Sequence, residues 1–336
     1  MKAFVTGATG FLGVHLLQEL SRAGWEIIAL HRKTSDLSDI RGLPGVRCVV
    51  GDVTDAESLR EAIPEGVDAV FHAAASVVDV PVHLEHTRFE VNQLGTRLVV
   101  QESLRKGARR FIYSSTVVTY DFESGGRVDE TRGPNVKSQD AYVRSKTLAD
   151  HEVKKGVAMG LDAVFLHPSV IFGAYDKANW SKLFLVMQKG LPFPFAPAGG
   201  TSAAHMRKVA EAHVAAFDRG RPGEHYILGG PDTTLLEVMR IIAQLLGCSP
   251  PKVALPNSIF RPLAWTEYRL SLMLGRQPVF TPHIIYVLTL YLLSDSSKAE
   301  RELGYRPSSV EEMLHDCYRW MVDTGRLPQR TSTTSS

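Results

Sequence analysis

Near its N-terminus the chain reads Val5-Thr6-Gly7-Ala8-Thr9-Gly10-Phe11-Leu12-Gly13, with a glycine at every third position after the threonine. The apolar run 2–6 has the length of a buried parallel strand, and residues 12–23 carry leucines at helical spacing. Glycine allows backbone torsions closed to other residues and lets the main chain approach an anion, while a helix N-terminus presents free amide groups. The stretch therefore predicts the first strand, turn and helix of a doubly wound sheet, with a dinucleotide pyrophosphate at the turn.

The spacing of these glycines leaves a second interpretation open. It is Gly-x-x-Gly-x-x-Gly and not the more general Gly-x-Gly-x-x-Gly. A glycine triplet by itself also fits a plain tight turn. The strand before it and the helix after it favour the dinucleotide site.

The end of the second predicted strand indicates which dinucleotide binds. Residues 25–30 form a further apolar run, and His31, Arg32 and Lys33 follow it. An NAD site has a carboxylate at this place to accept a hydrogen bond from the ribose 2'-hydroxyl, whereas a guanidinium holds the 2'-phosphate of NADP. Arg32 and Lys33 predict that NADP(H) is preferred over NAD(H); the alternative is that both are solvated loop charges.

A tyrosine and a lysine in the middle of the chain suggest proton transfer. Tyr142 and Lys146 are four residues apart in 140–156, which reads as a helix, so their side chains share one face. A nearby ammonium favours the phenolate and lowers the pKa of a tyrosine from its ordinary value of roughly 10. The apolar run 110–116 ends in three hydroxyl residues, and ligand groups gather at the carboxyl ends of strands. A hydroxyl, the phenol and the lysine could therefore converge on one carbonyl group.

Taken in order along the chain, these motifs resemble the extended short-chain dehydrogenase/reductase family over nearly the whole length. The motifs that carry the resemblance are Thr6 to Gly13, Gly51-Asp52-Val53, His72 to Ala75, Ser114 to Thr116, Tyr142 to Lys146 and His167-Pro168-Ser169. Within the family the chain is most similar to the dihydroflavonol reductase-like, hydroxysteroid dehydrogenase-like and hopanoid-associated branch. The resemblance implies an α/β fold, a Rossmann-type doubly wound parallel sheet with a smaller C-terminal substrate lobe.

The resemblance also implies roles for single residues. Thr116 would hydrogen-bond the substrate oxygen, with Ser115 as the alternate. Tyr142 would be the general acid in reduction and the base in oxidation, and Lys146 would hold the nicotinamide ribose and depress the pKa of the phenol. Besides Arg32 and Lys33, the expected cofactor-binding residues are Gly7, Thr9, Gly10, Phe11, Leu12, Gly13, Asp52, Val53, Ala73, Ala74, Ala75, Tyr142, Lys146, Pro168, Ser169 and Val170. For Asp52 and the alanines, ordinary turn and packing roles are equally compatible with the sequence.

Strand and helix patterns alternate to about residue 175 and then give way to loops rich in proline and glycine. The family resemblance implies an NADP-binding domain over 1–175, to which 209–228 returns. Residues 176–208 and 229–325 would build the substrate lobe. The serine- and threonine-rich end, 326–336, has the composition of a disordered tail.

The second lobe must distinguish a reductase from a sugar-modifying enzyme, because both share the catalytic trio. Nucleotide-sugar members of the family carry an arginine and a tyrosine before the position of His205 and an acid at the position of Lys208, and both features are missing here. Aromatic and methionine side chains suggest an apolar pocket or, alternatively, a core: Trp180, Phe184, Met187, Phe193 and Phe195.

The leading hypothesis is therefore an NADP(H)-dependent carbonyl reductase, or alcohol dehydrogenase in reverse, that acts on a hydrophobic ketone or aldehyde. The alternative is an epimerase or dehydratase of a sugar derivative. A non-catalytic NADP-binding protein would require a broken trio, and Thr116, Tyr142 and Lys146 are intact.

Composition limits the partners. The 336 residues with 44% hydrophobic content can bury a large core, and a net charge of +2 without a basic run gives no reason to expect nucleic acid. Three cysteines lie far apart without metal-ligand spacing, which suggests thiols in a reducing compartment and no metal site. The first strand begins at residue 2 without a leader, so we expect a cytoplasmic protein.

The most apolar stretch lies near the C-terminus. Residues 284–293 are too few for the roughly 20 needed to span a bilayer, so no transmembrane segment is expected. Together with the apolar run 259–265, they suggest peripheral membrane contact near 259–293. A homodimer is plausible because relatives pair through helices like the one after Glu85 and the one with Tyr142.

Overall fold

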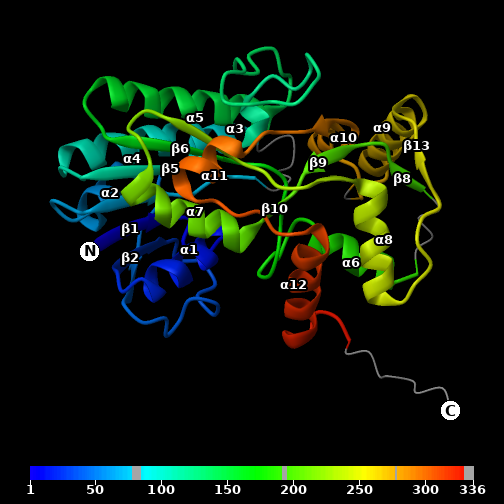
Figure 1. Cartoon of the computed structure of the whole chain (residues 1–336), viewed down its shortest axis with the longest axis horizontal. Helices are drawn as coiled ribbons and strands as arrows, with labels where there is room; N and C mark the ends of the chain where they lie inside the picture. The colour runs from blue at the N-terminus through cyan, green and yellow to red at the C-terminus, as the bar shows by residue number, and fades with distance from the viewer. Residues whose placement is uncertain (78–84, 191–194, 277, 329–336) are drawn as a thin grey trace.

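The computed structural model describes residues 1–77, 85–190, 195–276 and 278–328, and Figure 1 shows them in two lobes. The described part of the first lobe contains a seven-stranded parallel sheet in the order β11-β6-β5-β4-β1-β2-β3. Its strands are β1 (Lys2–Thr6), β2 (Glu26–His31), β3 (Val46–Val50), β4 (Ala69–His72), β5 (Arg110–Ser114), β6 (Ala163–Pro168) and β11 (His225–Leu228). The order reverses direction between β1 and β4, so the predicted doubly wound sheet is confirmed.

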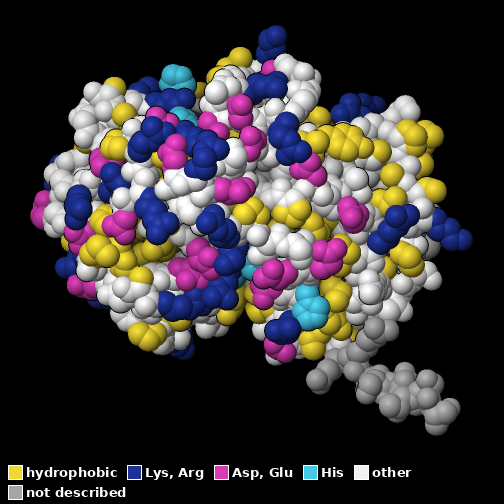
Figure 2. Space-filling model, viewed as in Figure 1, with side chains coloured by type: hydrophobic (Ala, Val, Ile, Leu, Met, Phe, Trp, Pro, Cys, Tyr) yellow, Lys and Arg dark blue, Asp and Glu magenta, His cyan; other side chains and the backbone are white. Residues whose placement is uncertain are grey.

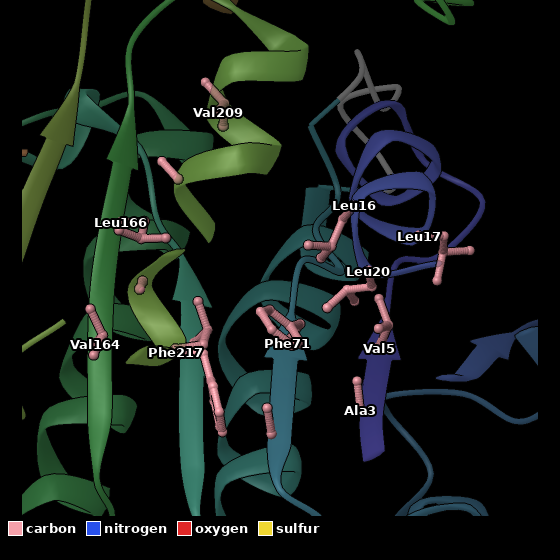
Figure 3. Packing of buried hydrophobic residues seen from close by; sticks show 14 of the residues in the cluster. Ala3, Val5, Leu16, Leu17, Leu20, Phe71, Val164, Leu166, Val209 and Phe217 are labelled. Carbon is pink, nitrogen blue, oxygen red and sulfur yellow. The ribbon is translucent and has the colours of Figure 1, made fainter. Parts of the chain in front are cut away.

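Helices cover both faces of this sheet, which is why its central strands are continuous apolar runs. On one face, α1 (Phe11–Arg22), α7 (Met206–Arg219) and α11 (Ser297–Leu303) share a core with β1 and β4, and Figure 3 shows this packing. On the other face lie α2 (Ala56–Ala62), α4 (Gly95–Arg105) and α5 (Ala141–Ala158).

The second lobe is built from short strands and longer helices around a separate core. Its elements are β7 (Ile171–Phe172), α6 (Ser181–Gln188), β8 (Phe195–Pro197), β9 (Gly200–Ser202), β10 (Ala204–His205), β12 (Asp232–Thr234), α8 (Leu235–Leu246), β13 (Val253–Leu255), α9 (Asn257–Met273), α10 (Pro282–Thr289), β14 (Tyr291–Leu292) and α12 (Val310–Asp323). No helix within the described ranges is long and apolar enough to cross a membrane.

The lobes are not continuous in sequence. The return of 209–228 to the first lobe corresponds to α7 and β11, which lie against the sheet. A second return, inside the 229–325 range assigned to the substrate lobe, is made by α11, whose Ala299 and Leu303 are buried in the core around α7. The predicted start of the disordered tail at residue 326 is too early, because Leu327 is buried against the second lobe's core. Residues 329–336 of the predicted tail lie outside the described residues.

The glycine turn fixes how β1 meets α1. Gly7 has φ +69°, and a Cβ on it would lie 2.6 Å from the backbone of Ala73 and Ala74. A Cβ on Gly13 would lie 2.1 Å from the carbonyl oxygen of Gly7. Real Cβ atoms do not approach backbone so closely, so any side chain at Gly13 would push the first turn of α1 away from the strand.

We predict that Gly13→Ala lowers the free energy of unfolding by about 3 kcal/mol, because the added methyl group overpacks rigid backbone. Gly133→Ala is the matched control, since a Cβ there meets no atom within 4 Å and Gly133 is not among the glycines with positive φ; we expect it to change stability by less than about 0.5 kcal/mol. Urea unfolding of both variants measures the difference. Equal stability of the two variants would show that the turn is not tightly packed.

Candidate functional site

The turn after β1 has the features of an anion cradle. Gly10 precedes α1 as its N-cap, is exposed, and donates its N–H to the carbonyl oxygen of Gly7 over 2.9 Å. Phe11 and Leu12 are half-buried in the first turn of the helix. The close backbone approaches at Gly7 and Gly13 are those that a dinucleotide pyrophosphate requires. The residues present therefore fit such a group.

The basic residues expected to select the cofactor lie at the carboxyl end of β2. Arg32 and Lys33 are both exposed, and the N–H of Arg32 donates to the hydroxyl of Ser35 over 3.1 Å. One of the two neighbours of β2 in the sheet is β1, which leads into the glycine turn. Both cations therefore lie at the same edge of the sheet as the cradle.

The remaining cofactor positions lie along the same edge. The carboxylate of Asp52 accepts hydrogen bonds from the backbone and hydroxyl of Thr54, at 2.9 and 2.8 Å, and Val53 packs beneath Gly95 of α4. Ala73 and Ala74 follow β4, half-buried, and Ala75 is exposed. A turn role for Asp52 and a packing role for the half-buried Ala74, the alternatives named above, are thus both present.

A buried chain of hydrogen bonds connects the cradle to α4. Nδ1 of His72 lies 2.7 Å from the hydroxyl of Thr6, and its Nε2 lies 2.9 Å from the hydroxyl of Thr96. The Thr96 hydroxyl donates to the carbonyl of Asn92, and the Thr6 hydroxyl accepts from the N–H of Ala74. This network assigns the proton to Nε2 of a neutral His72. Burial lowers the pKa of His72 to about 3, which agrees with that assignment.

Asn92 links the strand edge to α5. It lies in the π-helix η2 (Glu90–Leu94), between α3 (Glu85–Phe89) and α4. Its amide accepts from the N–H of Ser76 over 2.7 Å and donates to the carbonyl of Ser76 and the hydroxyl of Ser145. Ser145 in turn donates to the carbonyl of Tyr142. The π-helical turn thus places a buried amide where it fixes the helix that carries the tyrosine.

The three hydroxyls after β5 have different surroundings. Ser114 contacts Nε2 of His213, and Ser115 is buried and donates to the carboxylate of Asp150 over 2.6 Å. Thr116 is half-buried just before the 3-10 turn η3 (Val117–Thr119). Burial raises the pKa of Tyr142, and a hydrogen bond with the Thr116 side chain acts in the opposite direction.

The helix α5 begins where its capping residue predicts. Asp140 is the N-cap and accepts from the N–H of Val143 over 2.9 Å. This start buries Tyr142 and Lys146 in consecutive turns of one helix face. Burial raises the pKa of Tyr142 above its ordinary value, while the charge of Arg88 and the Thr116 hydroxyl act in the opposite direction. The phenol is therefore protonated at neutral pH.

A second cation, besides Lys146, lies beside the tyrosine. The guanidinium of Arg88 lies 5.8 Å from the ring centre of Tyr142. Burial raises the pKa of Tyr142, and the charge of Arg88 is the largest influence in the opposite direction. Arg88 is buried and donates to the carbonyl of Val77 over 3.2 Å. The role of Lys146 in lowering the pKa of the phenol stays a prediction.

Lys146 is held by the end of β5. Its ammonium donates to the hydroxyl of Tyr113 and to the carbonyl of Ser114, both over 2.9 Å. Burial lowers the pKa of Lys146 to about 8, and the charge of Asp150 acts in the opposite direction. Burial also raises the pKa of Asp150. An ammonium has three N–H groups, so two bonds fix its position and one can serve a ligand.

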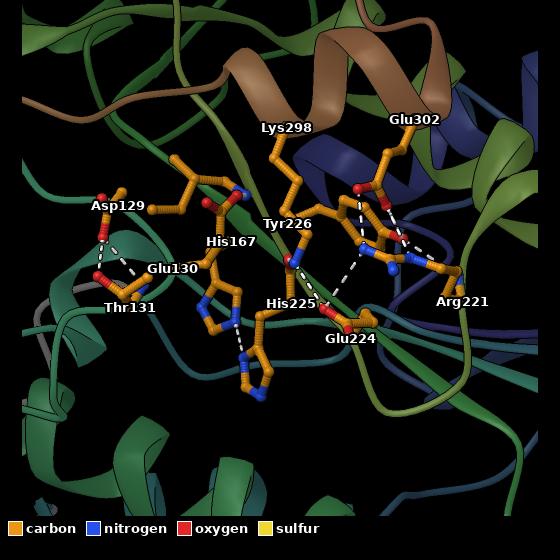
Figure 4. A network of polar contacts seen from close by, with 11 residues as sticks. Asp129, Glu130, Thr131, His167, Arg221, Glu224, His225, Tyr226, Lys298 and Glu302 are labelled. Carbon is orange, nitrogen blue, oxygen red and sulfur yellow. Dashed lines mark hydrogen bonds and ion pairs between the residues drawn. The ribbon is translucent and has the colours of Figure 1, made fainter.

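A pair of histidines, His167 and His225, lies next to the backbone of Thr116, and Figure 4 shows the pair within a larger polar network. Nδ1 of His167 lies 3.2 Å from the carbonyl oxygen of Thr116, and its Nε2 lies 2.8 Å from Nδ1 of His225. Burial lowers the pKa of both histidines to about 3, so both are neutral. After His167, Pro168 ends β6, and the hydroxyl of Ser169 lies 3.1 Å from that of Thr201. Val170 follows, half-buried, and packs against both the second lobe's core and the apolar cluster around Tyr142.

The second lobe contributes a histidine beside the tyrosine. His283, at the start of α10, lies 3.0 Å from the carboxylate of Asp140, and its ring meets the Tyr142 ring edge to face at 5.2 Å. By contrast, Phe184 and Met187 are buried in the second core and are not pocket residues. Phe193, named with them, lies outside the described residues.

Sequence reasoning missed several of these neighbours. They are Arg88, Asn92, Tyr113, Asp150 and His283. Tyr113 and Asp150 had a signal, since one belongs to the strand before the hydroxyls and the other lies one turn after Lys146. The other three come from segments whose approach depends on the fold.

Comparison with known proteins gives a consistent result. The model of the NAD dependent epimerase/dehydratase family matches residues 3–229. Sterol demethylase protein B of Methylococcus capsulatus is 31% identical over 97% of this chain and 100% of its own length. The 4-hydroxy-2-methyl-3-oxo-4-farnesyl-3,4-dihydroquinoline-1-oxide ketoreductase of Stigmatella aurantiaca is 29% identical over 98% of this chain and all of its own. The crystal structure of gox2253 superimposes with a TM-score of 0.83 at 32% identity, covering 97% of this chain and 99% of that one.

We predict that the buried histidines make the protein less stable in mild acid. Unfolded histidines bind protons below about pH 6.5, whereas burial lowers the pKa of His72 and His167 to about 3 and that of His213 to about 4. Their stabilising effect is complete above pH 6.5 and is lost as the pH falls toward these values. Between pH 6 and pH 5, each should lower the free energy of unfolding by about 1 kcal/mol.

The variant His72→Gln, followed by urea unfolding at both pH values, isolates one of these contributions. Its stability should fall by about 1 kcal/mol less over this interval than that of the unmodified protein. Exposed His151, replaced by Gln, is the control and should leave the pH dependence unchanged. An unchanged pH dependence in His72→Gln would mean that His72 is protonated in the folded state.

Proposed function

The chain belongs to the NAD dependent epimerase/dehydratase family, and on that premise we propose that it is an NADP(H)-dependent oxidoreductase that reduces a hydrophobic ketone or aldehyde to an alcohol. The predicted extended short-chain dehydrogenase/reductase family is thereby confirmed, and its chemistry is oxidation and reduction at a CH–OH group through a nicotinamide. The observation that carries the proposal is that α5 buries Tyr142 and Lys146 in consecutive turns, with the Lys146 ammonium bonded to the Ser114 carbonyl, two residues before Thr116.

The proposed chemistry divides between these three residues. A nicotinamide in its reduced form supplies the hydride. The Thr116 hydroxyl and the Tyr142 phenol polarise the carbonyl oxygen, and the phenol donates the proton to it. Burial, which raises the pKa of Tyr142, keeps this proton in place at neutral pH. The ammonium of Lys146, fixed by Tyr113 and the Ser114 carbonyl, holds the ribose with its remaining N–H.

We assign the hydroxyl role to Thr116 and not to the adjacent Ser115. The Ser115 hydroxyl is buried and donates to Asp150, so its proton is used within the protein. Thr116 is half-buried and interacts with Tyr142. We also propose the cofactor-binding roles expected from the sequence for the glycine turn, Asp52, Val53, Ala73–Ala75 and Pro168–Val170.

Two observations favour a hydrophobic substrate: the name of one relative, and the absence of two residues that nucleotide-sugar members of the family carry. The ketoreductase of Stigmatella aurantiaca is named for a ketone with a farnesyl chain. The arginine and tyrosine that nucleotide-sugar members carry before the position of His205 are absent from this sequence. NADPH and NADH oxidation against a panel of aromatic, aliphatic and steroid-like carbonyl compounds tests the proposal.

The second candidate is an epimerase or dehydratase of a sugar derivative, which the family's description favours. Cofactor that stays bound through purification, with no net oxidation of added NADPH by any carbonyl compound, would support it. Homodimer formation and a cytoplasmic location stay predictions from the sequence.

We predict that Tyr142→Phe lowers kcat about a thousandfold, because the variant keeps the ring but loses the proton donor. The dissociation constant for NADPH, measured by fluorescence titration, should change less than threefold.

We predict that Thr116→Ala lowers kcat about a hundredfold, and that Ser115→Ala, its matched control, keeps most of the activity. Full activity of Thr116→Ala together with loss in Ser115→Ala would move the hydroxyl role to Ser115.

We predict that Arg32→Ala weakens NADPH binding about a hundredfold and NADH binding less than threefold, because only NADPH carries the 2'-phosphate that the guanidinium would hold. Arg105→Ala is the control, since this exposed arginine ends α4 at the opposite edge of the sheet. Titration of each cofactor gives the four constants. Equal weakening of NADPH and NADH would rule out the 2'-phosphate role.

A further inference from the structure

The exposed hydrophobic residues of this chain are unevenly distributed. Of the sixteen large hydrophobic side chains exposed in the described residues, nine fall within 253–279, a segment described except at position 277. Figure 2 shows hydrophobic side chains gathered over the part of the second lobe where Figure 1 places α9 and β13. Single exposed apolar residues are normal, but a contiguous group of this kind marks an interaction surface.

The helix α9 carries most of this surface on its outer side. Ile259, Leu263, Leu270 and Met273 recur at helical spacing and are 50–81% exposed. Trp265, Leu272 and Leu274 extend the apolar surface on either side of this stripe. We call these seven residues the α9 face.

The inner side of α9 is already satisfied. Phe260 and Ala264 are buried, and they pack against Ile285 of α10. Phe280 meets Phe260 edge to face at 5.3 Å. These contacts fix the orientation of α9. The α9 face therefore points outward, and the described part of the chain does not cover it.

The charges around the α9 face have one sign. Every exposed charged residue between 252 and 276 is basic: Lys252, Arg261, Arg269 and Arg276. The single carboxylate in that range, Glu267, is half-buried and accepts hydrogen bonds from the backbone of Val279 and Phe280 at 3.0 and 3.1 Å. This distribution is local, because the whole chain has a net charge of only +2.

We propose that the α9 face binds the surface of a membrane that contains anionic lipid. An apolar stripe with tryptophan and arginine beside it is the pattern of a helix that lies in the interface, with its apolar residues among the acyl chains and its cations at the headgroups. A helix of 17 residues is about 25 Å long, and one side of α9 is buried in protein, so it lies on the bilayer and does not cross it.

A second copy of the chain fits the α9 face less well than lipid. Two copies related by a twofold axis would bring Arg261, Arg269 and Arg276 of both into one contact, without an exposed carboxylate from the same segment to oppose them. The stretch 284–293 offers less apolar surface, because Ile285 and Leu292 are buried and Tyr291 is its one exposed large hydrophobic residue. The proposed membrane contact is therefore centred on α9 and its flanks.

The proposed contact lies one helix away from the candidate site. The buried side of α9 packs on α10, and α10 carries His283 against Tyr142. A hydrophobic substrate dissolved in the bilayer would therefore be close to the site. The membrane contact itself does not depend on the proposed reaction, since it can be measured without turnover.

Cosedimentation of the full chain with vesicles tests the proposal. Vesicles of phosphatidylcholine with phosphatidylglycerol should bind the protein at least tenfold more strongly than vesicles of phosphatidylcholine alone, and salt should weaken the binding. The double variant Leu263→Glu, Leu270→Glu should lose at least tenfold in binding. Its thermal unfolding and its NADPH oxidation with a water-soluble carbonyl compound should be unchanged, because both leucines are exposed.

Met159→Glu is the matched control, since Met159 is 66% exposed at the end of α5, away from the α9 face; its binding should stay within twofold of the unmodified protein. Two results would overturn the proposal. One is binding by the double variant equal to that of the control. The other is no binding of the unmodified protein to either kind of vesicle. If the unmodified protein is then a dimer in solution and the double variant is a monomer, the α9 face binds a second copy of the chain.

Discussion

The structure depends on a contact in which there is no room for a side chain. A Cβ on Gly13 would lie 2.1 Å from the carbonyl oxygen of Gly7, and one on Gly7 would meet the backbone that follows β4 at 2.6 Å. Because these backbones are in contact, α1 starts directly after β1, and the segment after β4 lies beside the glycine turn. The hydrogen bonds from Thr6 through His72 to Thr96 then connect this turn to α4. The anion cradle and the sheet edge that holds the catalytic candidates are therefore parts of one packed unit.

In the candidate site, burial shifts the pKa values of a tyrosine and a lysine in opposite directions. Burial raises the pKa of Tyr142 and lowers the pKa of Lys146 to about 8, since it disfavours the charged form of each. The phenol thus keeps its proton, and the lysine stays charged at neutral pH with Asp150 behind it. Separation of this kind lets one site hold a protonated phenol and an ammonium at the same pH. The charge of Arg88 acts against the effect of burial on the pKa of Tyr142.

Local patterns predicted the parts of this arrangement that depend on nearby residues. The glycine turn and the start of α5 at Asp140 follow from backbone geometry and capping, and the sheet follows from apolar runs of strand length. The neighbours of the tyrosine could not be predicted in this way. Asn92 bonds to Ser145, 53 positions further along the chain, and His283 reaches Tyr142 from the other lobe. Such contacts depend on how lobes and helices meet. The hydrogen bond from Ser115 to Asp150, 35 positions further along the chain, could not be predicted either, and our proposal of Thr116 over Ser115 rests on it.

The proposed reaction is hydride transfer from a reduced nicotinamide to a carbonyl carbon beside Tyr142. We would test it by reaction with NADPH labelled with deuterium at C4, followed by mass spectrometry and NMR of the product. Hydride transfer gives a product alcohol with one deuterium on the carbinol carbon and an equal amount of oxidised cofactor. A product free of deuterium, formed while the cofactor returns to its starting state, would contradict it and identify an epimerase.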